Sequence, residues 1–195
     1  MAPVLGGSPV TGRRARVGRR SAETRVTLEL RLEGAGRLVW ASPEPSVAHP
    51  LDALTRYAGW DLRIRSAGDD PHHRAEDVAL ALGRAFRHAL PDRGIRRFAS
   101  ALVPMDESLV EVALDLIDRP YYRTDLPATS MAEHFLRSFV TEARLTYHQR
   151  IVREGEIHHL LEATFKATGV ALADAVRPAH RPLSTKGRVS WEGPE

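Results

Sequence analysis

The sequence has no cysteine among its 195 residues, so disulfide bonds and thiolate metal ligands are both excluded. Lysine is almost as scarce, because nearly all of the 28 basic residues are arginine and only Lys166 and Lys186 are lysines. No stretch approaches the roughly 20 apolar residues of a membrane span, and none resembles the apolar segment of a secretory signal. These absences predict a soluble, cytoplasmic protein with no membrane partner.

Apolar residues make up 43% of the chain, which is enough for one compact domain or two fused small halves. The net charge is only +3, and the sequence lacks basic clusters interleaved with aromatic residues, so we expect no nucleic-acid partner. Residues 1–20 are set apart by their glycine, proline and arginine content. They predict a flexible arm, for which contact with a polyanion is the alternative interpretation.

A three-part pattern of histidine and glutamate occurs twice in the chain. Residues 72–76 read HHRAE, and residues 158–162 repeat the pattern 86 positions later as HHLLE. Each block follows a lone histidine at nearly the same distance, with His49 lying 23 residues before the first block and His134 lying 24 residues before the second. A duplicated set of three imidazoles and a carboxylate indicates either two equivalent metal sites or one two-metal site of pseudo-twofold symmetry.

Helical spacing explains why these residue types suit a metal. If His72 begins a helix, Glu76 lies four positions after it and three after His73, so a carboxylate and an imidazole share a face. Adjacent histidines diverge by about 100° around a helix, so the two imidazoles could serve two different ions. Imidazole combined with carboxylate suits Mn, Fe, Zn, Co or Ni.

Hydropathy patterns predict two similar halves. In the first half, strands are predicted at residues 24–32, 37–40 and 60–65, and helices at 49–57 and 72–90. In the second, strands are predicted at 102–103, 109–116 and 144–152, and helices at 131–141 and 158–176. We therefore predict an α+β fold of two β-β-α-β-α halves, each with helices on one face of a sheet. The expected segments are an arm at 1–20, half-repeats at 21–107 and 108–187, and a tail at 188–195.

From about residue 20 to residue 187 the chain resembles the imidazoleglycerol-phosphate dehydratase family of histidine biosynthesis. Its motifs are RSAET at 20–24, HPLD at 49–52, HHRAED at 72–77, GIRRF at 94–98, PMDE at 104–107, DLIDRP at 115–120, HHLLE at 158–162, FKA at 165–167 and STKG at 184–187. The number and order of these motifs make a chance resemblance very improbable.

The resemblance implies two similar halves, two Mn(II) per site, and a homo-oligomer, typically of 24 subunits, with its sites at subunit interfaces. The implied metal ligands are the residues that the internal repeat selects: His49, His72, His73, Glu76, His134, His158, His159 and Glu162. Eight ligands divided between two ions would leave open positions on each octahedral metal, as a catalytic site requires.

The activity implied by the resemblance is that of a hydro-lyase, which removes water from imidazoleglycerol phosphate to give imidazole acetol phosphate. Two metals on the ring nitrogens would stabilise an imidazolate, whose electrons help to expel the hydroxyl group. Glu23 is the family-matched candidate for moving protons. Arg97, Arg119, Ser184 and Lys186 are implied to bind the substrate and its phosphate, for which guanidinium groups suit bidentate contact.

The sequence also departs from the family pattern around the implied ligands. The loop before His72 is shorter than usual, Arg74 stands where threonine is common, residues 47–50 read VAHP, and Glu156 replaces a common asparagine. These changes leave two alternatives open: a paralogue that acts on another imidazole or phosphate substrate, and a non-catalytic metal-binding assembly protein. The retained phosphate-end residues favour the lyase. Residues 104–107 are interpreted as a folding turn rather than a catalytic element.

Overall fold

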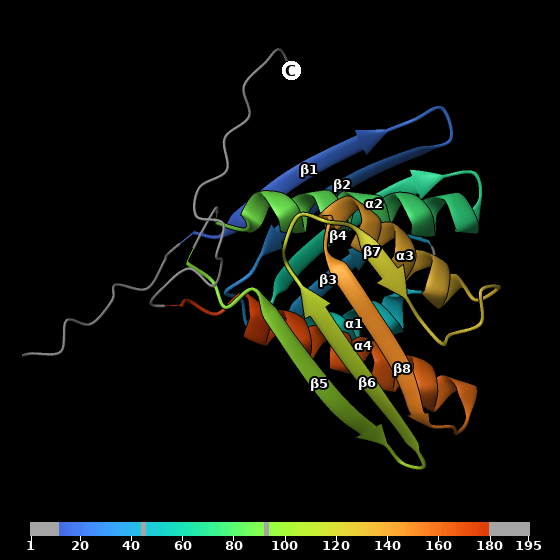
Figure 1. Cartoon of the computed structure of the whole chain (residues 1–195). Helices are drawn as coiled ribbons and strands as arrows, with labels where there is room; N and C mark the ends of the chain where they lie inside the picture. The colour runs from blue at the N-terminus through green and yellow to red at the C-terminus, as the bar shows by residue number, and fades with distance from the viewer. Residues whose placement is uncertain (1–11, 44–45, 92–93, 180–195) are drawn as a thin grey trace, which may run out of the picture.

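The computed structural model describes residues 12–43, 46–91 and 94–179 of the chain, which form two sheets with helices between them (Figure 1). The first sheet contains β1 (Arg14–Arg20), β2 (Thr24–Arg31), β3 (Arg37–Ala41) and β4 (Asp61–Gly68), in the order β1-β2-β4-β3. The second contains β5 (Phe98–Met105), β6 (Ser108–Asp115), β7 (Tyr121–Arg123) and β8 (Thr146–Arg153), in the order β5-β6-β8-β7. The helices are α1 (Ala48–Ala58), α2 (Pro71–Ala89), α3 (Met131–Ala143) and α4 (Ile157–Ala175).

The two halves have the same plan, which confirms the predicted duplicated α+β fold. In each half two antiparallel strands are followed by a third strand that pairs in parallel with the fourth, and the chain between those two contains a helix. Helix α2 packs on the first sheet and α4 on the second. The closest helix pairs, α2 with α3 and α1 with α4, each join one helix from either half. The four described helices therefore form a layer shared by both halves.

Two strands were not predicted, and both lie at sheet edges. β1 occupies the last part of the expected flexible arm, where it pairs with β2 along its whole length, so the prediction of an arm is wrong for residues 14–20. Its inward positions are only half-buried, since the strand has neighbours on one side alone. β7 has three residues and borders only β8. Short or weakly buried edge strands lack the clear alternation that marks a strand in a sequence.

The boundary between the halves also differs from the expected position after residue 107. β5 pairs with β6 in the second sheet, so the division falls between the end of α2 at Ala89 and the start of β5 at Phe98. A hairpin cannot be divided between two sheets without losing its hydrogen bonds. None of the described helices is long and apolar enough to cross a membrane.

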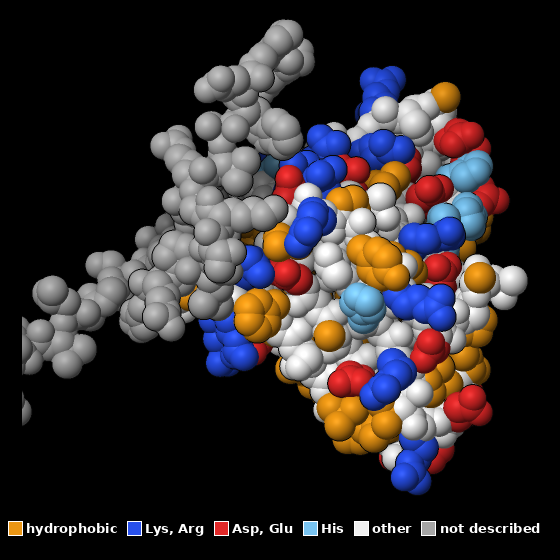
Figure 2. All heavy atoms as spheres, viewed as in Figure 1, with side chains coloured by type: hydrophobic (Ala, Val, Ile, Leu, Met, Phe, Trp, Pro, Cys, Tyr) orange, Lys and Arg blue, Asp and Glu red, His pale blue; other side chains and the backbone are white. Residues whose placement is uncertain are grey.

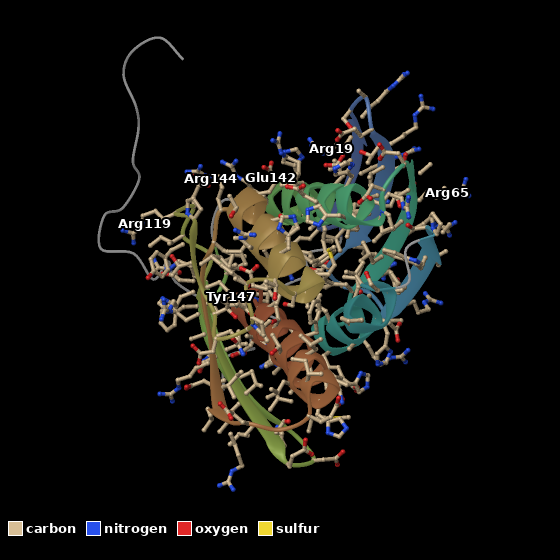
Figure 3. All side chains as sticks on the ribbon, turned by 90° about the vertical axis from the view of Figure 1, so that its right-hand side faces the viewer. Arg19, Arg65, Arg119, Glu142, Arg144 and Tyr147 are labelled. Carbon is tan, nitrogen blue, oxygen red and sulfur yellow. The ribbon has the colours of Figure 1, made fainter. Side chains whose placement is uncertain are left out.

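The core lies between the sheets and the helix layer. Alternate residues of β2, including Leu28 and Leu30, point inward and are almost fully buried. Trp60 and Phe86 pack ring to ring at 5.3 Å in the first half. Tyr147 projects from β8 towards the helices (Figure 3), where it is 1% exposed and forms a 2.8 Å hydrogen bond with Thr168. This packing fixes the helix ends that carry the repeated histidines.

Candidate metal-binding site

Both repeated motifs lie at the start of a 19-residue helix. The carboxylate of Asp70 caps α2 and accepts a 2.7 Å hydrogen bond from the amide of His72, and Pro71 occupies the first turn. The carboxylate of Glu156 caps α4 in the same way and accepts a 2.9 Å bond from the amide of His158. Capping holds the two helix ends in the same conformation, so equivalent motif residues point in equivalent directions.

The first group of candidate ligands joins α2 to α3. His72, Glu76 and His134 offer ligand atoms that all lie within 4.8 Å of one another. The two imidazole rings are stacked with centroids 4.5 Å apart, and Nε2 of His134 is 3.7 Å from a carboxylate oxygen of Glu76. Figure 2 shows histidine side chains among acidic ones at the edge of the molecule where α2 and α3 begin. His134, the lone upstream histidine of the second half, thus lies in one group with the motif residues of the first half.

The second group joins α4 to α1 by the same exchange. His49 and His158 are stacked 5.8 Å apart, and Nε2 of each lies 3.5 Å from the same oxygen of Glu162. Within the described part of one chain the repeat therefore forms two separate three-residue groups, one on each helix pair. Of the two arrangements left open by the sequence, this matches two equivalent sites.

The chemistry of both groups fits a divalent cation. Each offers two imidazoles and one carboxylate, a donor set common to Mn, Fe, Zn, Co and Ni. Nε2 of His134 is buried and has no hydrogen-bond partner among the described residues. Such an atom is costly to bury unless something occupies its lone pair. Three ligands per group also leave coordination positions for a substrate or for further protein ligands.

The remaining two histidines of the predicted ligand set point elsewhere. His73 lies nearly perpendicular to His72, and its Nδ1 is 3.3 Å from Asp69 and 3.8 Å from Glu23. His159 places Nδ1 3.1 Å from both carboxylate oxygens of Glu107. The structure thus brings six of the eight predicted ligands together in one chain and leaves the other two beside carboxylates. Divergence of adjacent histidines was predicted from helix geometry.

Glu107 is a member of the site that the sequence did not reveal. It was assigned to a folding turn, but its carboxylate accepts a 2.6 Å bond from the amide of Glu156 as well as contacting His159. These bonds lower the pKa of Glu107 to about 2, and the carboxylate in turn raises the pKa of His159. With Asp106, this pair forms a third group whose ligand atoms lie within 4.8 Å of one another. Glu107 lies in the β5–β6 turn, as Glu23 lies in the β1–β2 turn of the first half. The equivalence of these two positions was the sequence signal that could have identified Glu107.

Asp69 has the corresponding role in the first half. Its hydrogen bond with His73 lowers the pKa of the carboxyl and raises that of the imidazole. A carboxylate on one ring nitrogen fixes the orientation and tautomer of a histidine and leaves the other nitrogen free to bind. His73 is therefore held as ligands are held in metalloproteins, whereas His159 has a second carboxylate, that of Asp106, 3.6 Å from its Nε2 atom.

The carboxylate of Glu162 carries one additional contact. Nζ of Lys166 lies 2.8 Å from Oε1 of Glu162, and this ion pair lowers the pKa of the carboxyl. The equivalent position in α2 is Leu80, which follows Glu76 at the same spacing. The two metal-ligand groups thus differ in net charge although their ligands are the same.

The predicted catalytic and phosphate-binding residues are dispersed within the chain. Glu23 lies next to His73 with 57% of its side chain exposed. Arg97 pairs with Asp115 at 2.8 Å, and Arg119 lies at the same end of the second sheet, on its outside in Figure 3. That end is separated from the turn containing Glu107 by the length of β5, roughly 23 Å for seven residue steps. Ser184 and Lys186 lie outside the described residues.

Comparisons with known proteins agree with this geometry. The sequence model of the imidazoleglycerol-phosphate dehydratase family matches residues 44–172, which include both histidine motifs. The chain is 38% identical to the dehydratase of Dictyoglomus thermophilum over 184 residues, covering 91% of this chain and 99% of that protein. It is 42% identical to the dehydratase of Acidothermus cellulolyticus over 183 residues, covering 87% and 89%.

Solved structures show the same fold. The dehydratase of Pyrococcus furiosus superposes with a TM-score of 0.79 at 32% identity and covers 89% of this chain and 100% of that one. The Staphylococcus aureus enzyme gives 0.76 at 27% identity and covers 85% and 99%. Since sequence and fold agree along both halves, the chain belongs to the imidazoleglycerol-phosphate dehydratase family, as its motifs predicted.

Proposed function

We propose that this protein dehydrates imidazoleglycerol phosphate to imidazole acetol phosphate in histidine biosynthesis, with Mn(II) as the bound metal. The main support is the pair of His-His-Glu groups in a chain of this family, since each provides a partial coordination shell with open positions. Ions held by these residues would act as Lewis acids on the imidazole ring of the substrate and so favour loss of a proton from it. We place the reaction in the cytoplasm.

Proton transfer in this reaction requires a group that can both take up and release a proton. The hydrogen lost from the carbon beside the ring is not acidic, and the departing hydroxyl must leave as water. Glu23 suits this role, because its carboxylate is exposed beside His73 and accepts no hydrogen bond from the other described residues. Glu107, its counterpart in the other half, has a pKa lowered to about 2 and is therefore held as a carboxylate. We assign the proton transfer to Glu23.

The phosphate-binding residues support an active site assembled from several subunits. Arg97 and Arg119 lie at the opposite end of the second sheet from the turn beside His159, so one chain cannot bring them to its own second ligand group. We propose a homo-oligomer, of 24 subunits as in the family, in which arginines of one copy serve the site of another. His73 and His159 would complete ligand groups on neighbouring copies, since each is oriented by a carboxylate at its Nδ1 atom.

The decisive experiment is turnover of imidazoleglycerol phosphate by the purified protein with Mn(II), following formation of the acetol phosphate. We expect metal-dependent turnover that is lost in His72→Ala. The matched control is His88→Ala, which removes an exposed histidine from the last turn of the same helix and should leave turnover unchanged. A folded, manganese-loaded protein without turnover would contradict the proposal and favour a paralogue with another substrate.

A further inference from the structure

Asp77 is a buried carboxylate that follows Glu76 on α2 but faces away from the metal-ligand group, towards the first sheet. One of its oxygens accepts a 2.7 Å bond from Nε of Arg19, which Figure 3 shows above α2. Its other oxygen accepts a hydrogen bond from the hydroxyl of Thr24. Arg19 lies at the end of β1 and Thr24 at the start of β2. Asp77 therefore forms hydrogen bonds on both sides of the turn that contains Glu23.

The same turn is also attached to the loop that precedes α2. The carbonyl of Glu23 accepts a 3.3 Å bond from the amide of Asp69. Nη1 of Arg74, which is 8% exposed, donates a 2.8 Å bond to the carbonyl of Gly68. A side chain at Gly68 would come within 2.8 Å of the Glu23 carbonyl and 3.3 Å of Cγ of Arg74, so these three groups are closely packed. The loop and the turn thus move together with the start of α2.

Within the turn, the backbone of Glu23 is fixed while its carboxylate is not. The hydroxyl of Ser21 accepts bonds from the amides of Glu23, at 3.2 Å, and of Thr24, at 3.0 Å. The side chain of Glu23 projects beyond these contacts and remains exposed next to His73. This combination places a reactive group accurately and still leaves it accessible to a substrate.

The second half serves as an internal control for whether the fold needs these polar groups. The position equivalent to Asp77 in α4 is Ala163, which is fully buried, and the position equivalent to Arg74 is Leu160, which is 7% exposed. Both helices have 19 residues and begin with the same metal-binding motif. A carboxylate and a guanidinium are costly to bury, and the second half folds in the same way without them. Their presence in the first half therefore points to a local requirement of the turn that carries Glu23.

We propose that Asp77 is a positioning residue for Glu23. Through Arg19 and Thr24 it sets the β1–β2 turn at a fixed place relative to the N-terminal end of α2, so that the Glu23 carboxylate stays beside His73 and the first metal-ligand group. Arg74 supports the same arrangement from the other side of the turn. The inference deepens the proposed function and rests on it, because Glu23 is there assigned the proton transfer.

Two variants disrupt the hydrogen bonds of Asp77 with almost no change in side-chain volume. Asp77→Asn removes the charge and replaces one of the two accepting oxygens with an amide NH2 group, which cannot accept a hydrogen bond. Thr24→Val removes the hydroxyl. We expect each to lower kcat by about 10- to 100-fold, since small misplacements of a catalytic group can cost that much. The KM for imidazoleglycerol phosphate and the Mn(II) content should remain unchanged. Thr24→Ser keeps the hydroxyl and should restore kcat to within about threefold of the unmodified protein.

The matched control is Asp61→Asn. Asp61 lies at the opposite end of β4 from Gly68, where it binds the amide of Ala35 at 2.9 Å and has no contact with the Glu23 turn. Amide hydrogen exchange of residues 19–26 in the metal-free protein gives a second measure that does not depend on activity. We expect faster exchange there in Asp77→Asn and unchanged exchange in Asp61→Asn.

The outcomes separate the two proposals. Equal loss of kcat in Asp77→Asn and Asp61→Asn, or unchanged exchange of the turn in Asp77→Asn, would overturn the positioning role. Absence of turnover in the unmodified protein would instead contradict the proposed function. Exchange would then still decide whether Asp77 fixes the turn.

Discussion

The two halves of this protein share their candidate ligands and differ in what surrounds them. Helices α2 and α4 have equal length, equivalent caps and the same His-His-x-x-Glu motif. Around α2 the carboxylate of the turn residue Glu23 is exposed, and Asp77 binds the side chains of Arg19 and Thr24 on either side of that turn. Around α4 the carboxylate of the turn residue Glu107 is itself bound by the amide of Glu156. The comparison separates the two turns, since one presents an exposed carboxylate and the other a carboxylate held by hydrogen bonds.

The largest expected effect comes from removing one ligand of each group. His72→Ala and His158→Ala should each reduce bound Mn(II) from two ions to one per chain in the assembled protein. Each should lower kcat by more than the roughly 100-fold that loss of a ligand's outer partner can cost. Metal content and steady-state kinetics measure both effects. If either variant kept both ions, the equivalence of the two groups would be wrong.

Repetition selected the candidate ligands in the sequence without knowledge of contacts, and the structure brings six of these eight residues into two groups. His49 and His134 were chosen by their distance from the motifs, and the structure explains this, since each lies near the start of the helix that crosses the motif of the other half. The exchange between halves was not predictable. It depends on which helices pack together, and the pairing of α2 with α3 leaves no periodic signal in the sequence.

The carboxylates that contact His159 and the Glu23 turn escaped prediction for a related reason. Glu107 contacts His159 across 52 residues, and Asp77 contacts Arg19 across 58. Both carboxylates lie in family motifs, but no local spacing indicates which distant residue either one contacts, and PMDE was interpreted as a folding turn. The edge strand β1 was missed because its arginines resemble the composition of an unstructured arm.

The next largest effect concerns the carboxylates that contact His73 and His159. Asp69→Asn and Glu107→Gln should each weaken Mn(II) binding by about 10-fold, within the range found when such partners of metal-bound histidines are removed. Glu107→Gln should have the larger effect, because Glu107 contacts His159 through both oxygens while Asp69 contacts His73 through one. Isothermal titration of the metal-free protein measures this. Equal affinities in both variants and the unmodified protein would exclude these histidines as ligands.

A smaller effect in the opposite direction is expected for Lys166→Leu, which copies Leu80 of the first half. The ammonium group of Lys166 competes for the carboxylate of Glu162 and repels a cation. Its removal should tighten Mn(II) binding at the second group by about two- to fivefold, the range given by weak ion pairs near a surface. The affinity at the first group should stay the same, so the titration contains its own control. Weaker binding at the second group would show that Lys166 supports the site.

The smallest effect concerns stability as a function of pH in the metal-free protein. The pKa of Glu107 is lowered from 4.5 to about 2, chiefly by the amide of Glu156. A carboxyl with a lowered pKa stabilises the fold above its ordinary pKa, and this contribution is lost as the pH falls from 4.5 towards 2. The pKa of His159 is raised from 6.5 by Glu107. That contribution is complete below pH 6.5 and is lost as the pH rises through the raised pKa.

The two pKa shifts together predict that the effect of Glu107 on stability is greatest within a limited pH range. Glu107→Gln should lower the melting temperature most between about pH 4.5 and 6.5, where the carboxylate and the imidazolium are both charged in the unmodified protein. The difference should vanish near pH 2, since a protonated glutamate resembles glutamine, and should shrink at alkaline pH, where His159 is uncharged and the bond from the amide of Glu156 remains. Asp69→Asn should show the same window with a smaller amplitude, because Asp69 is bound less extensively. A difference that persisted unchanged to pH 2 would mean that Glu107 acts through shape and not through charge, and the contrast between the two turns would then lose its electrostatic basis.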